Sequence, residues 1–348
     1  MLSIITISVC NASECESEKV LEEYKPRYAK LFSIKYYKNF KIIESKNDRI
    51  LIGDKKSLNC KTKLFIMTDK ASRFVATSTT HLPFLKTFRL EKSLVGFQGV
   101  KYIYNEELKK QQVKDIHFQL NAEELLSLKP DLVMAYSSNL ASEKRIKDLR
   151  KLNVPIVLNR DFEETHPLAR AEWMVFSAAF FSKDQEAKKV FIALVDNYNS
   201  IKTIAMREAS VKPKILVGDI QNGKWATCGG TSDLAILIAD AGGDLILKSE
   251  SPETQNIPLE KILAAKITPQ YWLSQNTWTS KNESLKDSRY GQFKTIPLYN
   301  NNNLVNVNGF NDYWETGVSR PDLLLQDLYN IFTSQKNPNQ KLIWYKKL

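Results

Sequence analysis

Aromatic and polar residues follow several apolar segments of this 348-residue chain, at points where strands are expected to end. In open parallel sheets a ligand lies beyond the carboxyl ends of the strands. Flat rings combined with hydroxyls, amides and cations suit a large, partly planar ligand with a polar edge. The ligand-binding residues predicted in this way are His81, Tyr102, Tyr136, Arg160, Trp225, Trp278, Tyr313 and Trp314.

An enzymatic alternative depends on the few histidines of the chain. His81 and His166 follow predicted strands, and with Glu164 they could hold the metal of a metal-dependent hydrolase. Their spacing is unspecific, however, and the sequence has no dinucleotide-binding, Walker or nucleophile-elbow motif. A helix-start hydrogen bond for His81 and a turn before Pro167 for His166 are the simpler roles. We therefore predict no catalytic residue, no metal ligand and no cofactor.

Two similar segments each place a glutamate at the start of a short helix. Glu123 lies in the segment 121–136 and Glu260 in the segment 257–274, and each segment runs from an amphipathic helix through a proline into an apolar strand. Glu124 competes with Glu123 for the outward position. The repeat predicts two α/β lobes of related design, and the paired carboxylates suggest docking of a partner that contacts both lobes.

Strands and helices alternate along most of the chain, which predicts parallel sheets with right-handed crossovers. Residues 20–70 are expected to form irregular strands that end in an antiparallel edge or hairpin at 64–67. No proline or glycine interrupts 184–210, so one long, stiff connector helix is expected there. The other predicted strands are 73–77, 94–97, 132–135, 155–158, 214–217, 271–273 and 304–307. The other predicted helices are 82–90, 106–112, 122–129, 140–152, 168–181, 232–240, 259–265 and 321–332.

Composition limits the classes of function. The net charge is +11, with 43% hydrophobic residues. The basic residues are scattered among acidic ones, and there is no basic block or nucleic-acid motif, so we predict no nucleic-acid partner. The balance favours a folded, soluble protein of two domains.

The N-terminus resembles a truncated secretion signal. Residues 2–10 are apolar, are too short to span a bilayer and lack a basic start. Cys10 comes directly after this run, so it is the predicted lipidation site, with Cys15 as the weaker candidate. Cys60 and Cys228 are expected to be isolated buried thiols.

The chain resembles the class III periplasmic substrate-binding proteins of ABC importers, the group that includes iron–siderophore-binding and vitamin B12-binding proteins. The resemblance covers residues 70–335. It is carried by Asn121-x-Glu-x-Leu-x-x-Leu-Lys-Pro-Asp-Leu-Val, Glu164-Thr-His-Pro-Leu-Ala-Arg-Ala-Glu-Trp173, the long helix, Gly229-Gly-Thr-Ser-Asp-Leu-Ala235, Ala239-Asp-Ala-Gly-Gly243 and Asn311-Asp-Tyr-Trp-Glu-Thr-Gly-Val-Ser-Arg-Pro-Asp322. The long extension over 20–70 and the weak signal depart from the family pattern.

The resemblance implies two Rossmann-like lobes joined by a single long connector helix, with a ligand bound between them. It also implies that Glu123 and Glu260 pair with arginines of an inner-membrane permease. We accordingly predict a leader at 1–19, an N-terminal lobe at 20–183, a connector at 184–210 and a C-terminal lobe at 211–348. The expected protein is a monomer in the periplasm or cell envelope that binds an iron–siderophore or related metal chelate, a corrinoid being the alternative. The positive charge and Arg160 favour an anionic ligand.

Overall fold

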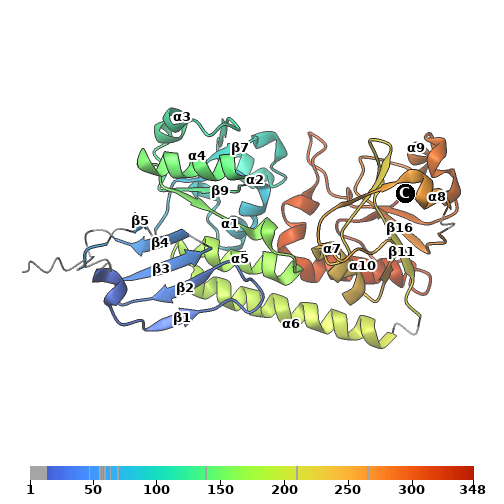
Figure 1. The fold of residues 1–348 in the computed structure, drawn as a ribbon, viewed down its shortest axis with the longest axis horizontal. Coiled ribbons are helices and arrows are strands. Elements are labelled where there is room, and N and C mark those ends of the chain that lie inside the picture. Colours follow the sequence, from blue (N-terminus) through green and yellow to red (C-terminus); the bar gives the residue numbers. More distant parts are fainter. Residues whose placement is uncertain are drawn as a thin grey trace, which may run out of the picture.

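The computed structural model describes residues 14–46, 48–54, 56, 58, 60–62, 64–68, 70–137, 139–208, 211–264 and 267–348. Two lobes of mixed α/β structure lie side by side, with helix α6 running beneath both of them (Figure 1). The helices are α1 (Pro83–Thr87), α2 (Glu106–Lys109), α3 (Ala122–Ser127), α4 (Leu140–Lys151), α5 (Pro167–Ala179), α6 (Asp184–Glu208), α7 (Asp233–Asp240), α8 (Leu259–Ala264), α9 (Lys281–Leu285) and α10 (Pro321–Phe332).

The first lobe is built on a parallel five-stranded sheet in the order β10-β9-β6-β7-β8. Every strand in it except β8 was predicted. The β8 segment is only three residues long, and two of the three are charged, so it lacks the apolar run by which a buried strand is recognised. The strands are β6 (Phe74–Ala76), β7 (Leu94–Gln98), β8 (Lys114–Ile116), β9 (Leu132–Ala135) and β10 (Ile156–Leu158).

The second lobe has a main sheet in the order β14-β11-β16-β17-β18 and a smaller antiparallel sheet in the order β12-β13-β15. In the main sheet all neighbours are parallel except β17 and β18. The strands are β11 (Lys214–Val217), β12 (Asp219–Gln221), β13 (Lys224–Thr227), β14 (Asp244–Leu245), β15 (Gln255–Pro258), β16 (Tyr271–Ser274), β17 (Leu298–Asn300) and β18 (Lys346–Lys347).

The strand predicted at 304–307 is wrong. The sheet instead takes up β17, where the Leu298 side chain is fully buried. Val305 and Val307 remain 46% and 89% exposed, and only an isolated bridge between Val305 and Asn311 forms there. An apolar alternation of this kind predicts a strand only if one face is buried, which is not the case here.

The duplicated segments fold as predicted, since helix α3 leads into β9 and helix α8 leads into β16. Asn121 caps α3 by accepting a hydrogen bond from the Glu123 amide at 2.8 Å. The long helix is present as α6 over Asp184–Glu208, and its last two predicted residues lie outside the described part of the chain. Helix α5 joins the two cores, because Trp173 and Phe176 pack into the first lobe and Leu168 and Ala171 into the second.

Residues 20–70 form an ordered five-stranded sheet in the order β1-β2-β3-β4-β5, where irregular strands were expected. Its strands are β1 (Glu22–Tyr24), β2 (Ser33–Tyr36), β3 (Phe40–Ser45), β4 (Asp48–Gly53) and β5 (Phe65–Met67). The edge strand β5 pairs with β4 in parallel, which corrects the predicted antiparallel edge. Apolar side chains of β2, β3 and β4 are buried in the first-lobe core.

A buried carboxylate fixes this sheet to helix α5. Glu172 is 1% exposed and accepts hydrogen bonds from the Tyr24 hydroxyl and from the backbone amides of Arg27, Tyr28 and Ala29, at 2.7–2.8 Å. Because four donors share one buried carboxylate, this side chain determines how the chain crosses from β1 to β2.

We expect Glu172→Gln to lower the free energy of unfolding by about 3 kcal/mol, because an amide presents one acceptor oxygen and leaves buried donors unpaired. Glu186→Gln is the matched control, because Glu186 is exposed and forms an ion pair with the neighbouring Lys183. Urea unfolding of both variants measures the difference. Equal unfolding free energies would show that the carboxylate does not hold the sheet.

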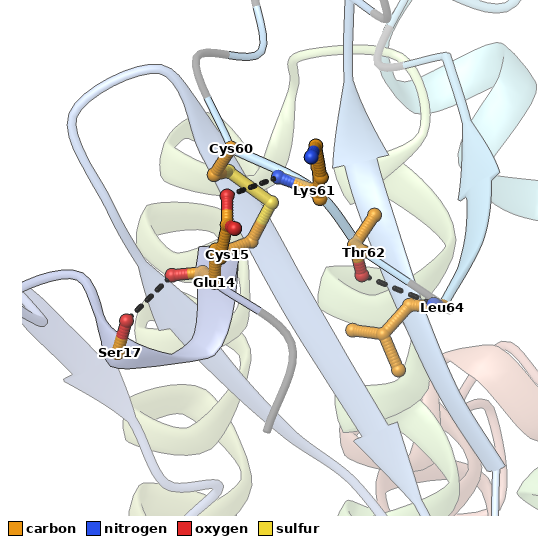
Figure 2. The surroundings of a disulfide bond; sticks show 7 residues. All are labelled: Glu14, Cys15, Ser17, Cys60, Lys61, Thr62 and Leu64. Atoms are coloured by element: carbon orange, nitrogen blue, oxygen red, sulfur yellow. Dashed lines mark hydrogen bonds between the residues drawn. A yellow bond between two sulfur atoms is a disulfide. The ribbon is translucent and has the colours of Figure 1, made fainter. Parts of the chain in front are cut away.

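The cysteine prediction is wrong for Cys60. Cys15 and Cys60 form a disulfide, with their Cα atoms 5.0 Å apart, and the Lys61 amide donates to the Glu14 carboxylate beside it at 3.2 Å (Figure 2). Cys15 is therefore excluded as a lipidation site. Cys228 is a free, partly buried thiol as predicted, and Cys10 lies outside the described residues. None of the helices in the described ranges combines the length and apolar character that a bilayer span requires.

Candidate functional site

A cleft of about 320 Å³ lies where the strand ends of the first lobe meet a segment of the second. The first lobe contributes residues that follow β6, β7, β8 and β9, and the second contributes the segment after β17. This is the position at which open α/β sheets bind ligands. The cleft is lined by Thr77, Ser78, Thr79, Phe97, Gln98, Tyr102, Phe118, Tyr136, Phe310, Asn311 and Trp314.

Three of the predicted ligand-binding residues meet in this cleft. Tyr102, Tyr136 and Trp314 all line it, and Tyr136 and Trp314 are 39% and 45% exposed. The ring of Tyr102 packs edge-on against Phe310 of the second lobe, with centroids 4.4 Å apart. Large aromatic side chains exposed in a concave surface are the usual anchors of a ligand site.

Three other predicted ligand-binding residues lie elsewhere. Trp225 is fully buried in the second lobe and donates its indole N–H to the Val217 carbonyl at 2.9 Å. Trp278 packs against Trp272 and Tyr290 in the same core. Tyr313 is 4% exposed and does not line the cleft. These three side chains pack within the second lobe and do not line the cleft.

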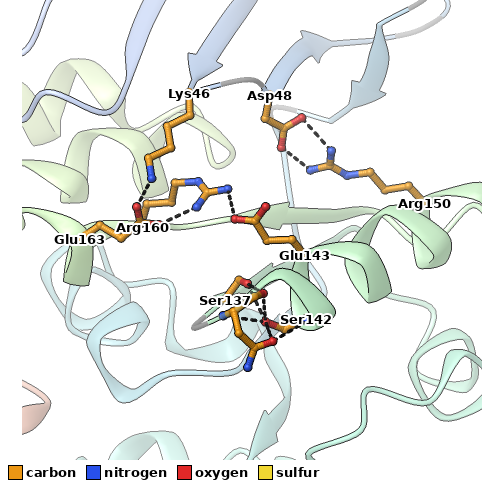
Figure 3. A network of polar contacts seen from close by, with 9 residues as sticks. Lys46, Asp48, Ser137, Ser142, Glu143, Arg150, Arg160 and Glu163 are labelled. Atoms are coloured by element: carbon orange, nitrogen blue, oxygen red, sulfur yellow. Dashed lines mark hydrogen bonds and ion pairs between the residues drawn. The ribbon is translucent and has the colours of Figure 1, made fainter.

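Arg160 is also unavailable to a ligand. It is 7% exposed, and its guanidinium pairs with Glu163 at 2.5 Å and Glu143 at 2.9 Å (Figure 3). Lys46, at the tip of the β3–β4 hairpin, joins the same network through Glu163. The structure therefore does not present Arg160 to an anion in the cleft, since its charge is paired within the protein. The neighbouring Arg150–Asp48 pair, with both contacts at 2.7 Å, also ties the N-terminal sheet to the first lobe.

The residues of the hydrolase alternative do not form a metal site. Glu164 accepts the backbone amides of Lys30 and Leu31, at 2.9 and 3.1 Å. His166 caps α5 by accepting from the Leu168 amide at 3.1 Å, which agrees with its predicted turn role. Within the described residues no group of three or more histidine, cysteine or acidic side chains is placed to hold a metal ion.

His81 lies in the interior beside these residues and not in the cleft. It is 1% exposed, burial lowers its pKa, and neither ring nitrogen has a hydrogen-bond partner among the described residues. Its ring is therefore not presented to a ligand in the cleft, and at the start of its helical turn only its backbone amide, which donates to the Ser78 carbonyl at 3.1 Å, makes a hydrogen bond among the described residues.

Eight lining residues of the cleft are not among the predicted ligand-binding residues: Thr77, Ser78, Thr79, Phe97, Gln98, Phe118, Phe310 and Asn311. Phe118 is 65% exposed and follows β8, so it could be found only by first recognising that short strand. Phe310 and Asn311 lie shortly before the predicted residue Trp314 in the sequence, and Gln98 is the last residue of β7.

The second-lobe segment 305–316, which we call the clasp, is hydrogen-bonded across to the first lobe. The Asn306 side-chain amide donates to the carbonyls of Lys101 and Ile103 at 2.9 and 2.8 Å. Thr79 donates its hydroxyl to the Trp314 carbonyl at 3.1 Å. Because these contacts lie beside the cleft, the clasp fixes the distance between its two walls.

Glu315 is one of two buried carboxyl groups of the clasp, the other being Asp312. It is 2% exposed and accepts the backbone amides of Tyr104 and Asn105 at 2.6 and 3.1 Å. Burial, and to a smaller extent the negative charge of Asp312, raises the pKa of Glu315 from its ordinary value of 4.5 to about 7, against the opposing effect of the two amide donors and Lys109.

The raised pKa predicts a pH dependence of stability. Between pH 4.5 and 7 the folded protein binds more protons at Glu315 than the unfolded chain does. Its contribution to stability is therefore complete below the unfolded pKa and is lost as the pH rises through about 7. We expect Glu315→Gln to reduce the fall in unfolding free energy between pH 5 and pH 8 by about 2 kcal/mol, measured by urea unfolding. An unchanged slope would assign the titration to another group.

A larger cavity of about 1170 Å³ lies on the other side of the clasp, against α1, α5 and α6. Its walls are mainly helix sides, and several of its charged side chains are paired within the protein. Arg170 contacts Asp233 at 2.5 Å, and Arg320 contacts Asp322 at 2.7 Å. The smaller cleft has the exposed rings and the strand ends, so it is the better candidate for the ligand site.

The two glutamates predicted to dock a partner are both exposed. Glu123 lies in the first turn of α3 and Glu260 in the first turn of α8, and both helices lie in the upper part of the molecule in Figure 1. The ambiguity with Glu124 is resolved, because the Glu124 carboxylate contacts the His117 ring at 3.0 Å and the His117 amide at 3.1 Å. Glu123 is therefore the outward carboxylate, and docking remains a prediction.

Comparison with known proteins agrees with this geometry. The family model described as "Periplasmic binding protein" matches residues 75–302. Among relatives, the uncharacterized lipoprotein MJ0878 of Methanocaldococcus jannaschii is 22% identical over 326 residues, which cover 88% of this chain and 75% of that protein.

Solved structures share the fold at low sequence identity. A periplasmic heme-binding protein from Pseudomonas aeruginosa superposes with a TM-score of 0.58 at 16% identity, covering 80% of this chain and 98% of its own. The periplasmic vitamin B12-binding protein BtuF of Vibrio cholerae superposes with a TM-score of 0.52 at 14% identity, covering 78% and 99%. Both likenesses extend over both lobes. The two-lobed α/β fold, the aromatic cleft between the lobes and the match of the family model over most of the chain together show that this chain belongs to the periplasmic binding protein family.

Proposed function

We propose that this protein is the substrate-binding component of an ABC importer, which holds an iron–siderophore or related metal chelate between its lobes and delivers it to a membrane permease. The observation that carries the proposal is the cleft itself, because both lobes supply exposed rings to it at the strand ends. Such a surface binds a large planar ligand without any group that performs covalent chemistry.

The names of structural neighbours support a metal chelate as the ligand. One neighbour is described as heme-binding and another as vitamin B12-binding, so the two ligands are an iron complex and a cobalt complex of a flat macrocycle. A corrinoid is accordingly the second candidate ligand for the cleft.

The proposed location is outside the cytoplasm, in the periplasm or cell envelope, where the protein would act as a monomer. The Cys15–Cys60 disulfide supports an oxidising compartment, because disulfides persist there and are rare in the cytosol. A lipid anchor at Cys10 is part of the proposal, and the description of one relative as a lipoprotein supports it.

Titration of the purified protein with metal chelates tests the proposed function. We expect one ferric or cobalt chelate to bind saturably with one molecule per chain, and the metal-free form of the same ligand to bind more weakly. Isothermal calorimetry gives the stoichiometry and metal analysis of the complex confirms it. If siderophore complexes, haem and corrinoids all fail to bind, the assignment of a metal chelate is wrong.

A further inference from the structure

We infer that the cleft selects an uncharged chelate whose edge carries hydrogen-bond donors, such as amide or hydroxyl groups. This inference deepens the proposed function and depends on it. It rests on three features of the cleft: the absence of ionisable partners, the state of its polar groups and the placement of its rings.

The cleft offers no counter-charge to an ionic ligand. Among its described lining residues none is acidic or basic. Arg160, the cation that sequence analysis placed here, is buried and held by two carboxylates. Lys101 is exposed on the rim, with its ammonium 5.2 Å from the ring centroid of Tyr102, and does not line the cleft. A charged ligand would lose hydration here without gaining a partner, whereas an uncharged ligand avoids this loss.

The serine and threonine hydroxyls of the cleft are already engaged within the protein. Thr77 accepts the Tyr136 amide at 3.1 Å, and Thr79 donates to the clasp. Ser78 shares a hydrogen bond with the Thr80 hydroxyl at 3.0 Å. These groups therefore contribute little to recognition of a ligand.

Two amide oxygens in the cleft are left to accept hydrogen bonds. The Gln98 side chain is 6% exposed, and its amide nitrogen donates to the His117 carbonyl at 3.4 Å. No donor to its oxygen is found in the part of the chain that the structure describes. The side-chain oxygen of Asn311 is buried and likewise lacks a partner there. An unpaired buried acceptor such as the Asn311 oxygen is costly, and the Gln98 oxygen is also open to a donor, so donors on the ligand would satisfy both.

The aromatic side chains complete the selection. Tyr136 and Trp314 come from opposite lobes, and Phe118 adds a third exposed ring. Rings of this kind provide contact area to the flat face of a ligand whatever its metal. The amide oxygens of Gln98 and Asn311 would then accept hydrogen bonds from donors on the edge of the ligand, so the preference for an uncharged edge comes from these two residues.

A charge series of chelates tests the inference. The probes are two uncharged chelates, ferrichrome and cyanocobalamin, and two anionic ones, haem with its propionates and a ferric tricatecholate. We expect an uncharged chelate to bind at least about tenfold more tightly than either anionic one, as expected where an ion would be buried unpaired. The affinity should not change appreciably with ionic strength, because no screened ion pair contributes.

Substitutions of Gln98 separate the effect of its acceptor oxygen from the effect of charge in the cleft. Gln98→Leu should weaken binding of the uncharged chelate by about tenfold, the usual size of one lost hydrogen bond to a buried group. Gln98→Glu keeps an acceptor oxygen, so it should retain that binding within a few-fold and weaken anionic probes further. Lys101→Gln is the matched control on the rim and should leave the affinity unchanged. Thermal unfolding of each variant reports whether it folds.

Three outcomes would overturn the inference. If an anionic chelate binds most tightly, with an affinity that falls with salt and in Lys101→Gln, the rim lysine recognises an anion and the inference alone is wrong. If Gln98→Leu binds the uncharged chelate as tightly as the wild-type protein does, the Gln98 oxygen does not accept a hydrogen bond from the ligand and the inference is wrong. If no chelate in the series binds, the proposed function fails and the inference fails with it.

Discussion

Reversal of both exposed glutamates, by Glu123→Arg together with Glu260→Arg, is expected to abolish transport while ligand affinity stays within a few-fold of the wild-type value. Both carboxylates lie in first turns of helices outside the cleft lining. Arginines at these positions would face cations of the permease, which costs on the order of several kcal/mol at a desolvated contact. Uptake of a radiolabelled chelate by cells carrying the cognate permease measures the effect.

Each single substitution should give a partial transport defect, because one lobe would still dock. Glu186→Arg is the control, since it makes the same change of charge in the first turn of α6, which runs along the lower side of the molecule in Figure 1. Wild-type uptake by the double variant would refute the docking role. Loss of ligand binding by the isolated double variant would instead place these side chains in the ligand site.

Trp314→Ala is expected to weaken chelate binding by about 2 kcal/mol or more, as large anchoring aromatics do when truncated at an interface. The ring is 45% exposed in the cleft, so its removal should change the unfolding temperature little. Trp278→Ala provides the comparison. That ring packs 5.1 Å from Tyr290 and 5.6 Å from Trp272 in the second-lobe core, so its loss should lower stability by about 3 kcal/mol.

Calorimetric titration and urea unfolding of the two variants separate these roles. The account requires that Trp314→Ala loses affinity and that Trp278→Ala loses stability. If Trp314→Ala instead loses stability and Trp278→Ala loses affinity, the ligand does not bind in the cleft that Trp314 lines.

The elements with strong local signals could be predicted from the sequence. Helix α10 begins at Pro321 and ends at Phe332, as predicted. The duplicated helix–proline–strand pattern also fixed the two places where α3 and α8 carry outward glutamates. Proline at a first helical turn, and helical periodicity that ends at a proline, depend only on neighbouring residues and so can be recognised without tertiary structure.

Trp225 was assigned to the site because it follows an apolar strand in the sequence. Asn222 and Gly223, with φ of 49° and 76°, form the turn between β12 and β13. Such an Asn-Gly pair is a hairpin signal, and it would have placed Trp225 within a strand and not in a strand-end loop. The Asn-Gly signal is local, so the position of Trp225 within a strand is predictable from the sequence alone.

Other errors could not have been avoided from one sequence. Cys15 and Cys60 are 45 residues apart and meet only because the N-terminal sheet brings them together. Whether Arg160 is available to bind an anion also depends on tertiary contacts, since its partner Glu143 lies in helix α4. A cation next to a strand end predicts an anion site only if no carboxylate of the protein reaches it first.

Hydrogen exchange of backbone amides, with and without the chelate that saturates the titration, tests most directly whether the ligand binds between the lobes. The account predicts that binding protects the segment 97–105 of the first lobe and the clasp of the second lobe together, while β1 to β4 and the residues of α6 at the larger cavity do not change. Protection confined to one lobe, or centred on α6 and α1, would contradict a ligand held in the aromatic cleft.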